Sequence, residues 1–568
     1  MAAQQVEWKG VQLHGAVQTD ILVPESDASI GTEHTNDAIQ TNTYVDLNLH
    51  SKYVDAGARL EYLQYPLPGF EADFKGWGVP HFYAKGKLKG VELTAGDMYE
   101  QFGSGFILRA YEERSLGIDN AIRGGRVKVN AIPGVRLTAL AGLQRRYWTW
   151  RDGGVLVGGD VEVDMDRFVP ALAQRGASWM LGASWVMKEE DRPTDEAPIF
   201  VPGTCFKLQV PQYVHAFDFR TQFQKQNFSI LAEYAMKSED PSHDNGYTFH
   251  RGSAVMLSAS YSKSGFSALL QAKRSEDMAL RSRRGMTGIS AFVNNMPAFA
   301  YQHSYALAAL YPYATQYANI NETGDRLVPG EWAFQAELGY TFKRKTPLGG
   351  KYGTKVKANF SHIRGLDPKR TEPTQLPDGT LTSYTYGGKG YETSFFGMSD
   401  KTFYQDFNLQ VEKKLSKQFK MNLMYMNQVY NQLIIENHGS MMTNNIIVLD
   451  GRYQCSKDLT LRLEYQHLFS HAKESAGEVP GDWDYVLAEL TILPHFMISL
   501  SDMVGKPYFA DGYKKKEHFY MGSVTYTHKA HRLSAGYGRT RAGYNCSGGV
   551  CRWVPASKGV TMSYNYSF

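Results

Sequence analysis

The chain has 568 residues, of which 43% are hydrophobic, and its mean hydropathy is −0.40. No uninterrupted apolar stretch approaches the roughly 20 residues that a transmembrane helix requires, so a helical membrane span is excluded. The net charge of +4 is too small to indicate a nucleic-acid partner. A membrane β-barrel stays possible, because a strand needs only about 9–11 residues and only one apolar face.

The first residues resemble the start of a mature secreted protein. Met1-Ala2-Ala3-Gln4-Gln5 reads as an added initiator Met before Ala-Ala-Gln, a sequence that often follows signal cleavage. No signal peptide is recognisable in the chain. We therefore expect that a targeting segment has been removed from it.

Several segments alternate apolar and polar residues with the period of a strand. In one of them, Leu338 and Tyr340 alternate with Glu337 and Thr341. Charged residues on the second face indicate a watery lumen rather than the dry interior of a sandwich. The 36 Tyr and 9 Trp fit aromatic girdles at two membrane interfaces, although other β-rich proteins are also rich in Tyr. The clearest alternating segments are 44–49, 334–342, 355–361 and 459–466.

The connections between these segments have two lengths, which alternate over much of the chain. The short ones are 346–351, 416–417, 456–458, 494–495 and 529–530. The long ones are 187–204, 236–250, 276–331, 365–401, 470–482 and 504–517. Tight periplasmic turns and longer outer loops are typical of outer-membrane barrels. The pattern predicts periplasmic termini and long loops outside the cell.

Counting candidate strands gives about 24. We predict an all-β fold, a single large transmembrane antiparallel barrel with an even strand number of about 22–26. One domain covers residues 1–568, with no separate plug or soluble domain, since alternation begins near Val11. The least clear stretch is 276–331. Its apolar run 305–311 is either a strand or a folded part of an outer loop.

The densest charged segment is 96–126, where both signs of charge stand close together among glycines. One interpretation is an ion-pair network, lumenal or loop-borne, that narrows the pore or holds an inward-folded loop. The other is a solvated loop whose surface charge pairs contribute little. The charged residues that we single out are Asp97, Glu100, Arg109, Glu112, Glu113, Arg114, Asp119, Arg123 and Arg126.

No motif for catalysis, a cofactor or a metal is present. The chain lacks H-E-x-x-H, C-x-x-C and G-x-S-x-G, and 103–105 is no phosphate loop because no Gly-Lys-Ser/Thr follows. Some outer-membrane barrels are hydrolases with Ser/His or Asp/His pairs, and nothing singles out such a pair here. Basic runs at 281–284 and 514–516 fall in predicted outer loops, where they would meet lipopolysaccharide or a partner protein, or only solvent. We expect no enzyme, cofactor or metal.

Two of the four cysteines are close in sequence. Cys546 and Cys551 enclose four residues and could close a small disulfide ring, which would indicate an oxidising compartment. The alternatives are two free thiols or half of a metal site, although no His or second Cys pair lies nearby. The pairing of Cys205 and Cys455 is left open.

The last ten residues alternate without error. The apolar face holds Val560, Met562, Tyr564, Tyr566 and Phe568, and the residues between them are polar. A final strand that ends on an aromatic residue is typical of outer-membrane barrels, because it faces lipid outward and water inward while closing the barrel. A soluble sandwich can also end on an alternating strand. We take Tyr564, Tyr566 and Phe568 as the terminal strand signal.

Two segments carry a family resemblance. Residues 545–559 with the terminal strand, and 99–105 with 111–120, resemble a family of Bacteroidota outer-membrane barrels catalogued as a domain of unknown function. The resemblance covers essentially the whole chain. It implies kinship with the integral accessory subunit of the Bacteroidota barrel-assembly machinery (BAM), which anchors surface-exposed lipoproteins. It implies no residue-level site.

Three functions are compatible with these observations. The first is a non-enzymatic accessory or scaffold subunit of an outer-membrane protein assembly complex of the BAM type. Its long outer loops would dock surface lipoproteins or other barrels, beside outer-membrane lipid and lipopolysaccharide. The alternative is a porin-like solute channel or transporter, since an unplugged wide barrel conducts. The third is a surface enzyme that acts on lipid or peptide.

Overall fold

The computed structural model describes residues 6–8, 10–32, 38–150, 154–191, 209–286, 291–315, 319–320, 327–371, 388–472, 478–509, 515–547 and 550–568. Within these ranges, no helix is long and apolar enough to cross a membrane. Strands dominate the structure, as the alternating sequence predicts.

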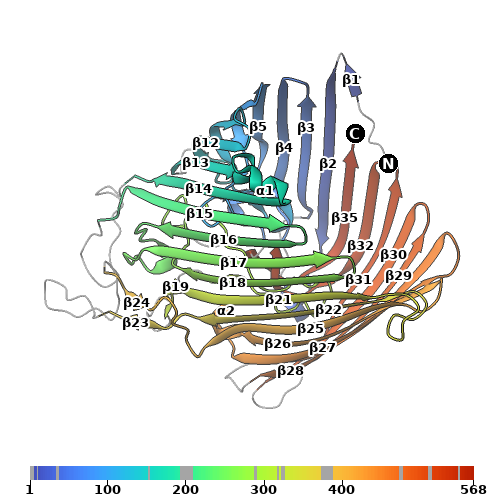
Figure 1. Ribbon diagram of the computed structural model, residues 1–568. Coiled ribbons are helices and arrows are strands. Elements are labelled where there is room, and N and C mark those ends of the chain that lie inside the picture. The colour runs from blue at the N-terminus through green and yellow to red at the C-terminus, as the bar shows by residue number, and fades with distance from the viewer. Residues whose placement is uncertain are drawn as a thin grey trace.

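Most of the described chain forms one closed antiparallel barrel (Figure 1). Its main sheet has 25 strands in the described residues, of which 24 form the ring and the three-residue β1 (Val6–Trp8) pairs only with β2. The first ring strand, β2, pairs with both β3 and the last strand, β35, and these pairings close the barrel. The predicted all-β barrel with an even strand number is therefore confirmed.

The ring strands are long and are joined to their neighbours in sequence. In the first half they are β2 (Val11–Pro24), β3 (Gln40–His50), β4 (Val54–Tyr65), β5 (Gly76–Leu88), β6 (Val91–Met98), β11 (Ile122–Val129), β12 (Val135–Gln144), β13 (Val155–Asp164), β14 (Ala177–Glu189), β15 (Tyr213–Lys225), β16 (Phe228–Lys237), β17 (Gly252–Lys263) and β18 (Phe266–Glu276). In the second half they are β21 (Gly330–Phe342), β22 (Thr354–Gly365), β25 (Thr402–Lys414), β26 (Phe419–Asn431), β27 (Met441–Gln454), β28 (Leu459–Ala472), β29 (Glu478–Ile492), β30 (Phe496–Phe509), β31 (Glu517–His528), β32 (His531–Thr540) and β35 (Ser557–Ser567).

The remaining elements are short and lie in the connections. They are β7 (Glu100–Gln101), β8 (Arg109–Ala110), β9 (Glu112–Glu113), β10 (Ile118–Asp119), β19 (Asn319–Ile320), β20 (Leu327–Val328), β23 (Pro368–Arg370), β24 (Tyr391–Thr393), β33 (Gly543–Ser547), β34 (Val550–Val554), α1 (Pro170–Gln174) and α2 (Gln432–Ile435), with 3-10 turns η1 (Ala28–Ile30), η2 (Ala72–Phe74), η3 (Arg114–Leu116), η4 (Met165–Arg167) and η5 (His243–Asn245).

Turns gather at one end of the barrel and the longer loops at the other. All five short connections predicted from the sequence lie between ring strands at the end where β2 begins and β35 ends. Two long loops are shorter than predicted, because β28 and β29 extend into 470–482, and β30 extends to Phe509. Polar residues at these strand ends, such as His471 and Asp482, interrupt the apolar pattern although the backbone stays paired.

The two faces of the wall differ as the alternation requires. On β28, Leu463 and Tyr465 are exposed on the outer face, whereas Glu464 and Gln466 point inward and are buried. Inward charged side chains near the turn end are solvent-exposed, among them Lys355 and Lys420. Near the long-loop end, the inward side chains are covered by chain segments that fold into the barrel. The lumen is therefore polar and wet at one end and filled at the other.

The carboxy-terminus seals the barrel against the first ring strand. The backbones of Phe568 and Gly15 exchange two hydrogen bonds, of 3.0 and 2.9 Å. A side chain at position 15 would collide with the Phe568 ring, so Gly15 leaves room for that ring. Tyr566 stacks on His531 of the neighbouring strand, and the hydroxyl of Tyr564 lies 2.9 Å from Nδ1 of the same His. All three residues of the terminal strand signal thus lie at the barrel seam.

Candidate functional site

Three loops enter the barrel from the end opposite the short turns, between β6 and β11, β18 and β21, and β32 and β35. We call residues 99–121 together with 277–286 and 291–315 the plug, and residues 543–547 with 550–554 the disulfide hairpin. Apolar plug residues such as Phe106, Leu108 and Leu307 are fully buried and belong to the same core as inward wall residues. The run 305–311 is thus part of the plug and forms no strand. Loops, rather than an amino-terminal domain, fill this half of the lumen.

The two loops of the plug are bonded to each other inside the barrel. The backbone N–H of Arg109 donates to the carbonyl of Val293 (2.8 Å), and that of Asn295 donates to the carbonyl of Gly105 (3.1 Å). The Nδ2 atom of Asn294 donates to the carbonyl of Phe106 at 2.7 Å. These bonds join segments almost 190 residues apart, so the loops form one unit.

The tip of the first loop rests on a carboxylate of the wall. Glu233 of β16 accepts hydrogen bonds from the backbone N–H and the hydroxyl of Ser104, at 2.9 and 2.6 Å. Gly103 has a φ of 52°, and a Cβ there would collide with the Glu233 carboxylate. Glycine is required here both by the left-handed backbone and by the close approach.

The base of the first loop carries a buried ion-pair cluster. Asp119 lies between the guanidinium groups of Arg59 and Arg145, and both Arg side chains are only 2% exposed. Glu61 bridges the same two Arg side chains at 2.7 and 2.9 Å. Burial alone would raise the pKa of Asp119, but Arg145 and Arg59 outweigh it and hold that pKa below its usual value. Glu112 extends the cluster, since it lies 2.7 Å from Arg59 and 2.6 Å from Arg114.

The other residues of the 96–126 segment take four different places. Arg126 lies 3.0 Å from Glu92 and 2.9 Å from Glu100, in a separate group on the lumen wall. Asp97 and Arg123 pair at 2.8 Å on the strand face that holds the exposed Leu93, and hence on the outer side. Arg109 lies over the ring of Tyr111. Glu113 accepts from Ser547 of the disulfide hairpin at 3.2 Å. The charged residues of 96–126 thus take part in several separate contacts rather than in one network.

The second loop of the plug is bonded to six wall strands, β18, β21 and β25–β28. Lys273 and Glu331 form a fully buried pair at 2.9 Å, and Glu331 also accepts from the hydroxyl of Tyr313. The other contacts are His303 to Asp406 (3.3 Å), Gln428 to the carbonyl of Tyr311 (3.0 Å), Tyr305 to Asp450 (3.3 Å) and the N–H of Leu307 to Gln466 (2.8 Å). Most of these partners are polar side chains that would otherwise face a watery lumen.

The basic run at 281–284 does not lie on an outer surface, contrary to prediction. Arg281 pairs with Asp244 at 2.6 Å, and Arg284 pairs with Glu190 at 3.2 Å, with both Arg residues about 3% exposed. Charge pairing draws this run into the plug, because isolated buried charges would be unstable. Of the second run, Lys514 lies outside the described residues.

Asp277, directly after β18, is a buried carboxyl group at the start of the second loop. Its carboxylate accepts from Asn245 at 3.1 Å and lies 3.8 Å from Nζ of Lys237, with Asp240 and Glu276 also near. Burial raises the pKa of Asp277 to about 7. Docking is therefore favoured while this carboxyl is protonated, and the contribution is lost as pH rises from 3.8 through about 7.

We expect the equilibrium constant for docking of residues 277–286 to fall about tenfold between pH 6 and pH 8, equal to ~1.4 kcal/mol. Hydrogen exchange of these amides, corrected for the intrinsic rate, measures it. In Asp277→Asn the pH dependence should vanish, because the amide does not titrate. An unchanged slope in that variant would assign the effect to another group.

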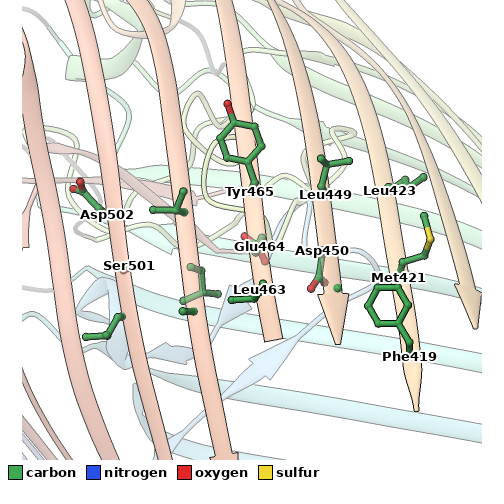
Figure 2. Close-up of a pocket in the computed structure, with 15 residues that line it drawn as sticks. Phe419, Met421, Leu423, Leu449, Asp450, Leu463, Glu464, Tyr465, Ser501 and Asp502 are labelled. Atoms are coloured by element: carbon green, nitrogen blue, oxygen red, sulfur yellow. The ribbon is translucent and has the colours of Figure 1, made fainter. Parts of the chain in front are cut away.

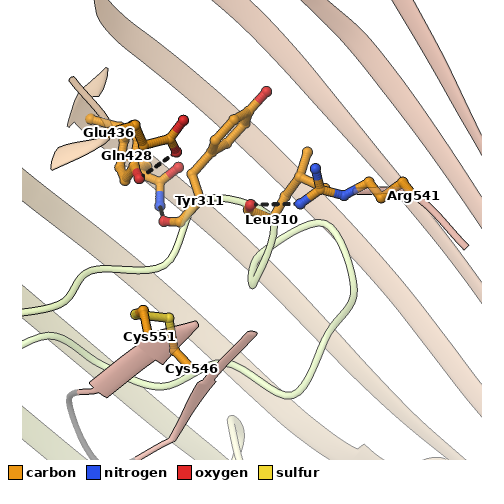
Figure 3. The surroundings of a disulfide bond; sticks show 8 residues. Leu310, Tyr311, Gln428, Glu436, Arg541, Cys546 and Cys551 are labelled. Atoms are coloured by element: carbon orange, nitrogen blue, oxygen red, sulfur yellow. Dashed lines mark hydrogen bonds between the residues drawn. A yellow bond between two sulfur atoms is a disulfide. The ribbon is translucent and has the colours of Figure 1, made fainter. Parts of the chain in front are cut away.

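The disulfide hairpin ties both loops of the plug together. Cys546 and Cys551 form the predicted disulfide across paired positions of β33 and β34. Two residues before the hairpin, Arg541 donates to the carbonyl of Leu310 of the second plug loop at 3.0 Å (Figure 3). On the other side, Arg552 donates to the carbonyl of Leu116 at 2.6 Å. The hairpin is thus a strap across the two loops.

Loss of the disulfide should loosen this strap. For so short a loop, the chain-entropy model gives a contribution of about 2 kcal/mol. We expect Cys546→Ser with Cys551→Ser to raise hydrogen exchange in the hairpin roughly 30-fold, with the barrel strands unchanged. Cys455→Ser is the matched control, since Cys455 is an exposed free thiol. Equal exchange in the double variant and wild type would contradict a strapping role. Cys205 lies outside the described residues.

Several contact residues were missed by sequence reasoning. Arg59, Glu61 and Arg145 lie on or next to other strands, 60 and 84 positions from their partners. For Arg59 and Glu61 the only signal was a charged residue on the non-apolar face of an alternating strand, and Arg145, just after β12, carried no such signal. Across the described chain, no group of His, Cys, Asp and Glu is arranged to hold a metal ion.

Solved structures match nearly the whole chain, at low similarity. The siderophore receptor PirA from Pseudomonas aeruginosa is 11% identical with a TM-score of 0.39, covering 98% of this chain and 80% of its own. OccAB3 from Acinetobacter baumannii is 9% identical with a TM-score of 0.34, covering 98% and 99%. The copper transporter OprC is 9% identical with a TM-score of 0.38, covering 98% and 80%.

No curated protein matches the sequence. One family model does match, over residues 1–568, and its description is a family of unknown function, DUF6029. This agrees with the resemblance to an uncharacterised barrel family, but a Bacteroidota origin and a place in the barrel-assembly machinery do not follow from it. Because the match spans the whole chain, the protein belongs to the DUF6029 family.

Proposed function

We propose that this protein is an outer-membrane channel for a small solute, with the plug as its gate. A closed ring of 24 strands with an apolar outer face and a charged inner face is the architecture of a membrane pore. By the general rule for such barrels, the turn end with both termini is periplasmic, and the plug loops enter from outside.

The observation that carries the proposal is the way the plug is attached. Besides packing in the apolar core that it shares with the wall, the plug makes hydrogen bonds and ion pairs to inward side chains, such as Asp406, Asp450 and Gln466. Water can replace these partners when a loop leaves, whereas a purely apolar contact would lose its stabilisation outright. A gate needs attachments of this kind.

Planar-bilayer recording tests the proposal. We expect the wild-type protein to show rare, brief openings, and a variant with a loosened plug to conduct for long periods. A loosened-plug variant that folds but stays silent would overturn it. The heat-dependent gel shift of folded barrels serves as the folding control.

A second candidate is the accessory subunit of an outer-membrane assembly complex, and one observation favours it. The outer wall over β26–β30 has an apolar groove of about 700 Å³, with Leu463 and Tyr465 in its lining (Figure 2). The small residues Gly451 and Ala488 also line it, and both are paired with Leu463 across neighbouring strands. A groove of about 680 Å³ lies over β4–β6 and β11–β14, and one of about 530 Å³ lies over β11–β15. Such recesses would accept the side chains of a neighbouring barrel.

Purification in mild detergent distinguishes this candidate from a lone channel. A stoichiometric complex with another barrel, lost in Ala488→Trp but kept in Leu47→Trp on a distant strand, would support it. A monomer in every case would contradict it.

A further inference from the structure

A cavity of about 260 Å³ lies between the second plug loop and the disulfide hairpin. It borders Cys546 of the hairpin, whose disulfide holds this wall in place, and Tyr311 of the plug (Figure 3). The volume equals about nine water molecules at ~30 Å³ each. The cavity is thus large enough for one small organic ring, but not for a macromolecule.

The lining combines aromatic rings with neutral polar groups. Tyr301 and Tyr313 come from the plug and Tyr544 from the hairpin, so rings stand on more than one side. Gln302 and Asn545 are exposed and bring amide donors and acceptors to the same cavity. Among the described residues that line it, none is Asp, Glu, Lys or Arg. The cavity therefore offers stacking surfaces and hydrogen bonds but no countercharge.

One buried polar atom in this lining lacks a protein partner. The His303 side chain is 2% exposed, and its Nε2 lies 3.3 Å from Asp406. Its Nδ1 has no hydrogen-bond partner among the described residues. An unsatisfied buried ring nitrogen costs free energy, which a hydroxyl group entering the cavity would recover.

We propose that this cavity is a recognition site for a neutral saccharide ring. The C–H faces of a sugar pack against tyrosine rings, and its hydroxyl groups both donate and accept hydrogen bonds, which matches Gln302, Asn545 and His303. A quaternary ammonium ligand also favours aromatic walls, but here it would lack a carboxylate in the lining. The inference deepens the proposed channel, because it names the class of solute.

The position of the site links recognition to the gate. Tyr544 lies three residues after Arg541, which donates to the carbonyl of Leu310. The second plug loop and the disulfide hairpin form two sides of the cavity, and they must separate when the plug opens. A ligand bound in the cavity therefore contacts both the second plug loop and the disulfide hairpin. Its occupancy would bias the equilibrium between docked and released loops only if it binds one state better.

Saturation-transfer NMR and calorimetry on the full-length protein in detergent test the proposal, with glucose, maltose and N-acetylglucosamine as probes. We expect saturable binding of at least one sugar, weakened at least tenfold in Tyr544→Ala and in Asn545→Ala. Tyr340→Ala is the matched control, since Tyr340 is exposed on the outer wall. The gel shift verifies that each variant is folded.

Three results would overturn the site: no binding of any probe, binding unaffected by both cavity variants, or a preference for choline over the sugars. Conductance is measured separately. A protein that conducts without binding sugar removes this inference alone. One that binds sugar while its loosened-plug variant stays silent removes the channel and keeps the recognition site.

Discussion

Asp119→Ala should release the first plug loop from the barrel wall. The substitution leaves Arg59 and Arg145 buried with one carboxylate fewer between them, and both guanidinium groups are almost fully covered. Removing one partner of a buried ion pair typically costs about 3–5 kcal/mol. Because Asp119 lies in the loop and its partners belong to the wall side, we expect the loss to appear as loop release rather than as unfolding of the barrel.

Hydrogen exchange over residues 109–121 measures this effect. The expected loss corresponds to at least ~100-fold faster exchange in that loop, with the ring strands little changed. The matched control is Asp164→Ala, which removes a 2.6 Å pair with Arg136, a side chain that is 44% exposed. Exposed pairs contribute about 0–1 kcal/mol, so exchange should hardly change there. Similar small effects in both variants would show that the cluster does not hold the loop.

A compensating variant distinguishes two causes of loop release: loss of the attraction between Asp119 and its Arg partners, and burial of Arg charges without a partner. Adding Arg59→Met and Arg145→Met to Asp119→Ala removes the uncompensated charges and keeps much of the apolar volume. If stranded charge causes the release, part of the protection should return, as buried ion pairs are often replaceable by apolar groups. The same variant therefore also carries Glu61→Gln, because Glu61 contacts both Arg side chains and would otherwise become the buried unpaired charge.

The fold could be predicted because its signal is local. Alternation with period two appears within ten residues, as on β35 and β21, and it identifies the outer face without knowledge of neighbours. Strand ends were harder to predict. At His471 and Lys506, near the long-loop end of β28 and β30, the outward side chains are polar rather than apolar. The apolar–polar alternation therefore ends before the strand does.

The plug could be predicted only in part. The density of charge in 96–126 indicated either an inward-folded loop or a solvated one, since a sequence does not show where its charges find partners. Arg59 and Asp46 face residues 112–119 because the ring brings β3 and β4 to that side of the lumen. Likewise, the run 305–311 is apolar enough for a strand, but its residues pack against side chains from β26–β28. These contacts between segments far apart in sequence exist because the closed barrel brings the segments together.

The strongest test of gating is to remove the side-chain hydrogen bonds that join the two plug loops. Asn294 is 1% exposed, and its side chain makes three hydrogen bonds: to the carbonyls of Phe106 (2.7 Å) and Met278 (2.6 Å), and from the N–H of Leu280 (3.0 Å). Asn120 likewise bonds the carbonyls of Arg109 (3.0 Å) and Phe292 (2.9 Å). Each buried group left unpaired costs about 1–3 kcal/mol.

Asn294→Ala with Asn120→Ala should therefore shift the plug toward release by several kcal/mol, and raise the open probability in planar bilayers at least ~100-fold. Asn427→Ala is the control, because Asn427 makes its 3.0 Å bond to Asn445 outside the plug. If the double variant shows increased hydrogen exchange in both loops but no conductance, the loops leave without opening a path. In that case the barrel is a scaffold with a permanently blocked lumen, because solute passage requires that releasing the plug also frees the pore.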